Sequence, residues 1–121
     1  MYRTTLQYLD DILEATDKIL KFGKGVSFEE FSSDEMRKDA VIRNFEVIGE
    51  AIKKLPPELT ERYPDIDWKR IAGLRDALIH GYFNVKLTVI WNIMNDYLPK
   101  LKSDINAVLA DEEKRESERK D

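Results

Sequence analysis

The sequence predicts an all-α protein, an up-and-down bundle of four main helices with additional short helical pieces. Apolar residues recur every three or four positions through most of the chain, which is the pattern of amphipathic helices. No stretch alternates apolar and polar residues for long enough to predict a strand. The strong breaks are few: Gly-Lys-Gly at residues 23–25 and Pro56-Pro57, with a weaker one at Pro64.

The first helix is expected over residues 4–22. Its apolar side chains follow a helical spacing, and Gly23 directly after it is a typical C-cap because glycine adopts left-handed backbone angles easily. After the Gly-Lys-Gly break, one short helical turn is expected at residues 27–31.

The second helix is expected to begin at Ser32 or Ser33 and to end at Pro56-Pro57. Ser32 and Glu35 have the spacing of a capping box, in which each side chain bonds to the other residue's backbone N–H. Gly49 lies in the helix interior, where glycine costs ~1 kcal/mol relative to alanine. We therefore expect another helix to approach closely at Gly49.

A connector follows, with a helical turn expected at residues 58–62. Asp65 or Asp67 is a suitable N-cap for the third helix because its carboxylate can accept a bond from a free backbone N–H. This helix is expected to end near His80, since a histidine in the last turn followed by Gly81 is a stop signal.

The fourth helix is expected over residues 85–98. Pro99 then kinks the chain or starts a new helix. Residues 111–121 contain only charged residues and Ser117, which is typical of a solvated or frayed end. We therefore expect a helical domain at residues 1–110 and a charged tail at 111–121.

The composition limits the possible classes of protein. A chain of 121 residues, 42% apolar and 36% charged, fits one globular domain and is neither disordered nor membrane-spanning. It has no cysteine, and its first residues lack the apolar segment of a signal peptide, so a cytoplasmic protein without membrane contact is expected. The net charge of -4 provides no general field for nucleic acid, so any RNA contact must use a local patch.

Residues 73–82 hold the only histidine, His80, with Arg75 five positions before it and Tyr82 two after. On a helix, Arg75 and His80 would lie ~140° apart, whereas Asp76 and His80 would share a face. Arg75 falls within an apolar stripe, and an unpaired buried guanidinium is costly. Arg75 must therefore be paired, face a cleft or bind an anion.

Purely structural roles explain the same residues. His80 before glycine is an ordinary helix end, favoured by the helix dipole. Arg75 can pair with Glu46 or Glu50, and Tyr82 can sit at the rim of the core. Four cations are candidates to add charge to a cleft, although they fit a solvated face as well: Lys53, Lys54, Lys69 and Arg70.

The functional alternative is a phosphodiester site. Arginine offers a planar cationic fork for phosphate oxygens, and histidine as a residue type titrates near neutrality and can move a proton. RNA supplies its own nucleophile, the 2′-hydroxyl. No metal-ligand spacing, serine–histidine–acid arrangement or glycine-rich phosphate loop is recognisable, so no cofactor is expected.

Residues 75–82 (RDALIHGY) resemble the R-x4-H-x-Y signature of the HEPN superfamily, and most closely that of HepT-like toxins of prokaryotic toxin–antitoxin pairs. The likeness extends to residues 43–51 (RNFEVIGEA), to residues 63–68 (YPDIDW) and to residues 84–99, which contain Trp91. In all it covers about residues 5–110.

This resemblance implies a metal-independent ribonuclease built as a homodimeric helical bundle. It assigns catalysis to Arg75 and His80, with Asp76 in support. It also implies a nucleotidyltransferase antitoxin of the MntA type, which silences such toxins by adding AMP to the motif tyrosine, here Tyr82. The RNA substrate, transfer or messenger RNA, stays open.

Acid–base cleavage of RNA calls for two proton-transfer groups, and the chain has one histidine. A two-fold dimer would bring a second Arg75 and His80 to one cleft, so a composite site is expected. Two other interpretations remain: a non-catalytic HEPN module that docks a nucleotidyltransferase or a nucleotide, and a purely structural dimeric bundle.

Overall fold

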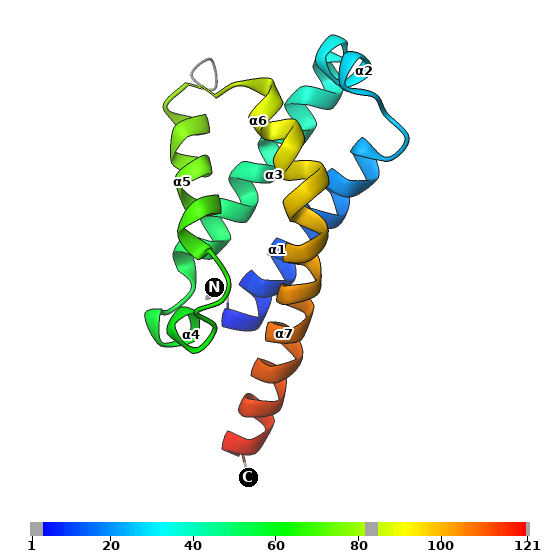
Figure 1. Cartoon of the computed structure of the whole chain (residues 1–121). Coiled ribbons are helices and arrows are strands. Elements are labelled where there is room, and N and C mark those ends of the chain that lie inside the picture. The colour runs from blue at the N-terminus through cyan, green and yellow to red at the C-terminus, as the bar shows by residue number, and fades with distance from the viewer. Residues whose placement is uncertain (1–3, 82–84, 121) are drawn as a thin grey trace.

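The computed structural model describes residues 4–81 and 85–120, and these form an all-α bundle without strands (Figure 1). In the described part of the chain, no helix has the length and apolar character needed to cross a bilayer. The elements are, in order, α1 (Thr5–Gly23), α2 (Phe28–Ser33), α3 (Glu35–Lys54), α4 (Pro57–Arg62), α5 (Trp68–Ile79), α6 (Leu87–Asn92), the π-helix η2 (Ile93–Tyr97) and α7 (Leu98–Lys120).

Four long pieces make the bundle: α1, α3, α5 and the continuous run from α6 to α7. α3 packs against α1 on one side and α5 on the other, while α7 covers α1. Their apolar faces form one core, whose largest fully buried side chains include Phe31, Phe45, Ile71 and Leu98. The predicted all-α bundle of four main helices with short pieces is therefore confirmed.

The helix starts follow local capping chemistry. α1 has a capping box between Thr4 and Gln7, and α2 has one between Ser27 and Glu30. The expected box at Ser32 is wrong, because that serine lies inside α2 and bonds to a carbonyl of its own helix. Asp34 caps α3 instead. Its nearby Arg37 lowers the pKa of the Asp34 carboxyl through the bond from the Arg37 backbone N–H.

The π-helix η2 precedes Pro99 and accommodates this proline within the helical run. Proline has no N–H to donate, and its ring crowds the carbonyl four residues earlier in an α-helix. η2 lies directly before it, and the Leu98 N–H bonds to the carbonyl of Ile93, five residues back. The helical backbone continues from η2 into α7, which is assigned from Leu98, so the predicted restart at Pro99 is wrong, while a kink there stays a prediction. The preceding helix starts at Leu87, later than the expected residue 85.

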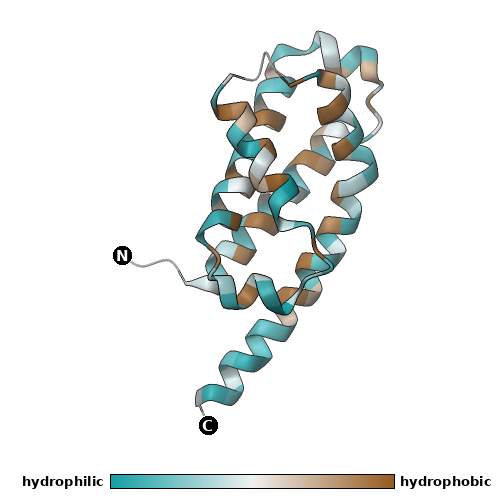
Figure 2. Cartoon of the chain, turned by 60° about the vertical axis from the view of Figure 1, so that its left-hand side comes forward, coloured by the Kyte–Doolittle hydropathy of each residue, from teal (hydrophilic) through white to brown (hydrophobic). Residues whose placement is uncertain are grey.

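The charged C-terminal residues continue α7 to Lys120, and its hydrophilic last turns extend past the bundle (Figure 2). Two of these charged residues, Asp111 and Glu112, form hydrogen bonds to the bundle. The Arg62 guanidinium donates to both carboxylate oxygens of Glu112, at 2.8 and 3.2 Å, and the Glu112 side chain is 9% exposed. The Tyr63 hydroxyl lies 2.5 Å from Asp111 and 2.6 Å from Glu112, donating to one at a time. A frayed end is therefore wrong for Asp111 and Glu112, while a domain boundary at residue 110 stays a prediction.

Candidate active site

α5 carries Arg75, Asp76 and His80 and is defined at both ends. Asp67 is the N-cap: its carboxylate accepts a bond of 3.1 Å from the backbone N–H of Arg70. At the other end, the His80 N–H still donates to the carbonyl of Asp76, at 3.1 Å. Gly81 then takes a φ of 135°, which glycine alone adopts without strain. The chain thus leaves the helix directly after His80, as the sequence predicts.

Arg75 lies against α3 at Gly49. A β-carbon built at Gly49 would be 2.1 Å from the Arg75 β-carbon and 2.7 Å from its γ-carbon. The stem of the arginine therefore occupies the space that any side chain at position 49 would need. The predicted close helix approach at Gly49 is confirmed, and the residue on the opposite helix is the candidate catalytic arginine.

Acidic groups hold the Arg75 guanidinium. One terminal nitrogen donates to Asp76 Oδ1 at 3.0 Å, and the other lies 3.7 Å from Glu50 Oε1. Lys53 from α3 bonds to the same oxygen of Asp76. Lys53 first, and Arg75 second, lower the pKa of the Asp76 carboxyl. The predicted pairing with Glu50 is therefore present, whereas Glu46 lies 4.0 Å from Arg43 instead.

Arg75 is nevertheless not fully satisfied. Its Nε is buried and has no hydrogen-bond partner in the described ranges. The side chain as a whole keeps 25% of its surface exposed, and its neighbour Glu50 keeps 44%. A guanidinium held by exposed carboxylates can exchange one of them for a phosphate, since both ligands use the same fork geometry.

His80 is exposed at the C-cap of α5. From helix geometry it lies ~140° around the axis from Arg75 and roughly 7.5 Å further along it. The two side chains thus leave the helix on different sides, and both reach solvent. The Asp76 carboxylate is engaged by Lys53 and Arg75, which places it to fix the arginine. Its expected support of His80 stays a prediction, and Tyr82 lies outside the described residues.

Two of the surface grooves formed by the described residues bear on the site. One, of about 560 Å³, includes Arg75 and the exposed side of α3; it is lined by Tyr8, Asp11, Arg43, Val47, Glu50, Ala51, Lys53, Lys54 and Arg75. The other, of about 880 Å³, lies where α4 and the start of α1 meet the end of α7. Its lining mixes three arginines with four glutamates, so it has no charge preference. Among the described residues no cluster of histidine, aspartate and glutamate could hold a metal ion.

The fold is an all-α bundle, and its helix α5 presents a partly exposed arginine with an exposed histidine directly after it. The family model "Ribonuclease HepT-like" matches residues 12–108, and the chain belongs to this family.

Its relatives carry ribonuclease names. "Probable ribonuclease HepT" of Thermococcus cleftensis is 41% identical over 84% of this chain and 93% of its own length. "Putative RNase MJ1216" of Methanocaldococcus jannaschii is 42% identical over 86% of each chain. "Putative RNase TTE0752" of Caldanaerobacter subterraneus is 39% identical over 91% of this chain and 98% of its own. No solved structure matches the chain significantly.

The sequence does not predict the positions of two residues near the site, Lys53 and Arg43. Lys53 fits a solvated face by spacing, and its bond to Asp76 joins residues 23 positions apart on different helices. The only signal for Arg43 in the sequence is its place in residues 43–51, which resemble the family pattern. Its position in the groove beside Arg75 follows from the packing of α3 between α1 and α5.

Proposed function

We propose that this protein is an endoribonuclease toxin that cleaves RNA without a metal ion, using Arg75 and His80. Membership of the ribonuclease HepT-like family supports this proposal. The observation that carries it is the pairing of a partly exposed guanidinium, held by replaceable carboxylates, with an exposed imidazole on the same helix end. Both reach solvent, and because they leave α5 ~140° apart, the proposed dimer is what brings an arginine and a histidine to the same ribose-phosphate link.

In the proposed reaction, the 2′-hydroxyl of the substrate attacks the adjacent phosphorus, and an imidazole takes its proton. The bond from phosphorus to the 5′-oxygen breaks, and an imidazolium returns a proton to that leaving oxygen. The products are a 2′,3′-cyclic phosphate and a free 5′-hydroxyl. General acid–base catalysis of this kind contributes typically ~10²–10⁴-fold in rate.

Arg75 has the complementary role of stabilising charge. The phosphorus passes through a five-coordinate state with extra negative charge on its non-bridging oxygens, and a fixed cation at that place lowers the barrier. Asp76 and Glu50 hold the guanidinium before substrate arrives. Because they share its fork, an incoming phosphate must displace at least one of these contacts.

A homodimer is part of the proposal, because one chain has a single histidine for two proton transfers. Ile79, directly before His80, keeps 44% of its surface exposed, and so does Val89 after the connector. An exposed apolar side chain directly before His80 is compatible with a subunit interface at this end of α5. We expect activity per mole of protein to fall on dilution through the dissociation of the dimer; constant specific activity in a demonstrated monomer would remove the composite site.

The proposed partner is a nucleotidyltransferase antitoxin that adds AMP to Tyr82. An AMP group brings a phosphodiester charge and a purine next to the RNA site. That charge repels incoming phosphates, and the purine blocks access.

Expression in a bacterial host tests the proposal. Wild type should arrest growth, His80→Ala should not, and sequencing RNA ends after arrest should identify transfer or messenger RNA as the substrate. Equal growth of both strains, with the nucleotidyltransferase still bound, would instead indicate a non-catalytic docking module. The exposed His80 makes a folding defect in this variant unexpected, which equal melting temperatures would verify.

A further inference from the structure

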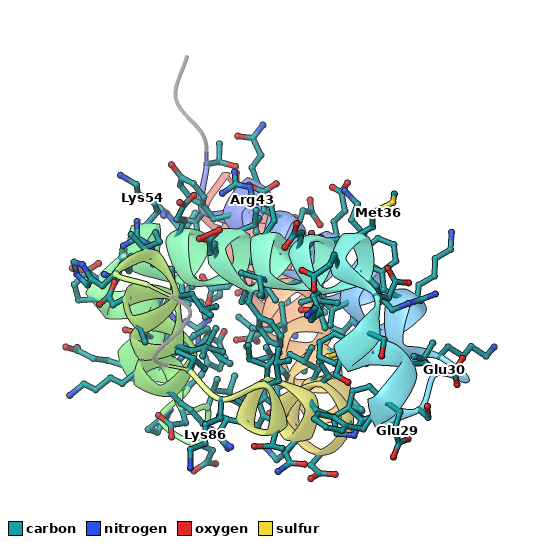
Figure 3. The ribbon with its side chains drawn as sticks, turned by 90° about the horizontal axis from the view of Figure 1, so that it is seen from above. Glu29, Glu30, Met36, Arg43, Lys54 and Lys86 are labelled. Atoms are coloured by element: carbon teal, nitrogen blue, oxygen red, sulfur yellow. The ribbon has the colours of Figure 1, made fainter. Side chains whose placement is uncertain are left out.

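The groove of about 560 Å³ is lined by the outer face of α3 and includes Arg75, which packs against α3 at Gly49. Four of its lining residues are spaced as one helical stripe: Arg43, Val47, Glu50 and Lys54. At 100° per residue these positions fall within about 60° of one another. Figure 3 shows Arg43 and Lys54 on the same outer side of α3, pointing away from the bundle interior. The stripe is about 16 Å long, the length of roughly five stacked nucleotides.

The groove is cationic although the chain is acidic. Arg43, Lys53, Lys54 and Arg75 line it, against the two carboxylates of Asp11 and Glu50. Lys53 and Arg75 are engaged by Asp76, but Arg43 meets Glu46 only at 4.0 Å and keeps 65% of its side chain exposed. Lys54 is exposed and forms no ion pair with any of the described residues. Two cations at the ends of the stripe are thus available to an external anion.

The groove also has an apolar floor. Val47 and Ala51 lie along it, and Tyr8 from α1 adds an aromatic ring. Cations along a track together with an aromatic ring are the elements of sites that bind single-stranded nucleic acid, where the backbone follows the charges and a base can stack.

We propose that this groove binds the sugar-phosphate backbone of the RNA strand beside the scissile link, with Arg43 and Lys54 contacting phosphates. This inference rests on the proposed ribonuclease function, because Arg75 lines the groove and its guanidinium is the proposed catalytic cation. A strand lying along α3 between Arg43 and Lys54 therefore passes Arg75. Arg43 and Lys54 are the local cations through which this acidic protein would contact RNA.

The decisive comparison uses two double variants with the same change of net charge. Arg43→Glu with Lys54→Glu reverses the groove, and Lys100→Glu with Lys102→Glu reverses two exposed cations of α7 as a control. Each is combined with His80→Ala. The probe is a fluorescent single-stranded RNA of twelve nucleotides carrying 2′-O-methyl groups, which lacks the attacking hydroxyl. Anisotropy gives the dissociation constant at several salt concentrations.

We expect the groove variant to bind the probe at least tenfold more weakly than the control. The slope of log affinity against log salt should also fall by about 1.4, which is ~0.7 for each of two phosphate contacts. These results would support RNA binding in the groove even if wild type cleaved no RNA. The proposal of RNA binding and the proposal of RNA cleavage can therefore be refuted separately.

Equal binding of the probe by the two double variants would refute the proposal that the groove binds RNA, and it would leave the proposed ribonuclease activity unaffected. A change in molecular mass of the groove variant, with probe binding unchanged, would show that this face is a subunit interface and would overturn it as well. Loss of nucleotidyltransferase binding with unchanged probe binding would identify a protein-docking surface, with the same consequence.

Discussion

The Arg75 β-carbon lies where a side chain at Gly49 would be, 2.1 Å from an ideal β-carbon at that position. Real β-carbons do not approach so closely, and the crowded atom is fixed to the backbone of α5. Gly49 therefore sets the distance between α3 and α5, and with it the place of the guanidinium. The helix accepts ~1 kcal/mol of poorer propensity at Gly49 in return for this contact.

Gly49→Ala should destabilise the protein by about 1–3 kcal/mol, because the overlap forces the two helices apart. It should also impair RNA cleavage, since the guanidinium moves away from Glu50. Gly73→Ala is the matched control: it lies on α5 with no heavy atom within 4 Å of an added β-carbon. That variant should gain up to ~1 kcal/mol. Chemical denaturation measures both, and a Gly49→Ala protein as stable as Gly73→Ala would refute the role of the close approach.

Asp76→Asn should lower stability near neutral pH and lose that effect in acid. Lys53 and Arg75 depress the pKa of Asp76 in the folded state below the unfolded value of ~3.9. A depressed carboxyl pKa stabilises the fold above the unfolded pKa, and the contribution disappears as pH falls through the folded pKa. Melting temperatures of wild type and variant should therefore differ at pH 6–7 and converge only as the pH falls below the unfolded pKa of ~3.9 and through the lower folded pKa. A difference independent of pH would assign the effect to something other than this charge.

Removing residues 111–121 should cost about 1–3 kcal/mol, because Arg62 and Tyr63 lose the buried Glu112 carboxylate. A shorter truncation after Glu116 keeps Asp111, Glu112 and Arg115 and serves as the control. It should melt close to wild type. Equal stability of the two truncated chains and wild type would instead agree with a self-sufficient domain at residues 1–110.

Tyr82→Phe should keep the ribonuclease active and make it resistant to the nucleotidyltransferase. Phenylalanine lacks the hydroxyl that would accept AMP. The measurement is growth of cells that express the variant together with the partner, with mass spectrometry of the toxin. Silencing of the variant without any added mass would show that the partner works by binding alone.

Much of the fold could be predicted because its signals are local. Apolar spacing and the breaks at residues 23–25 and Pro56 delimit α1 and α3, and Asp67 and Gly81 delimit α5. The predicted cap at Gly23 is wrong, because Gly23 is the last residue of α1 and Lys24 is its C-cap. The wrong cap at Ser32 has a clear reason. Ser27 with Glu30 and Ser32 with Glu35 both offer a serine before a glutamate at the start of an apolar run, and only the first serine begins a helix.

The rest depends on contacts between distant residues. Nothing near Asp111 and Glu112 in the sequence predicts that Tyr63 and Arg62 meet them, so a run of charges is easily taken for a frayed end. The site divides in the same way. Arg75 and His80 can be identified from the sequence motif, and Glu50 can be predicted as a partner of Arg75. The bonds from both Lys53 and Arg75 to Asp76 cannot be predicted in this way, because they form only when α3 packs on α5.

The most direct test of the central claim is cleavage of a single-stranded RNA by the purified protein in a buffer containing EDTA, with analysis of the product ends. We predict 2′,3′-cyclic phosphate and 5′-hydroxyl ends, and rates at least 100-fold lower for His80→Ala and for Arg75→Ala. Undiminished cleavage by a folded His80→Ala protein, or cleavage only on adding a divalent ion, would contradict the account.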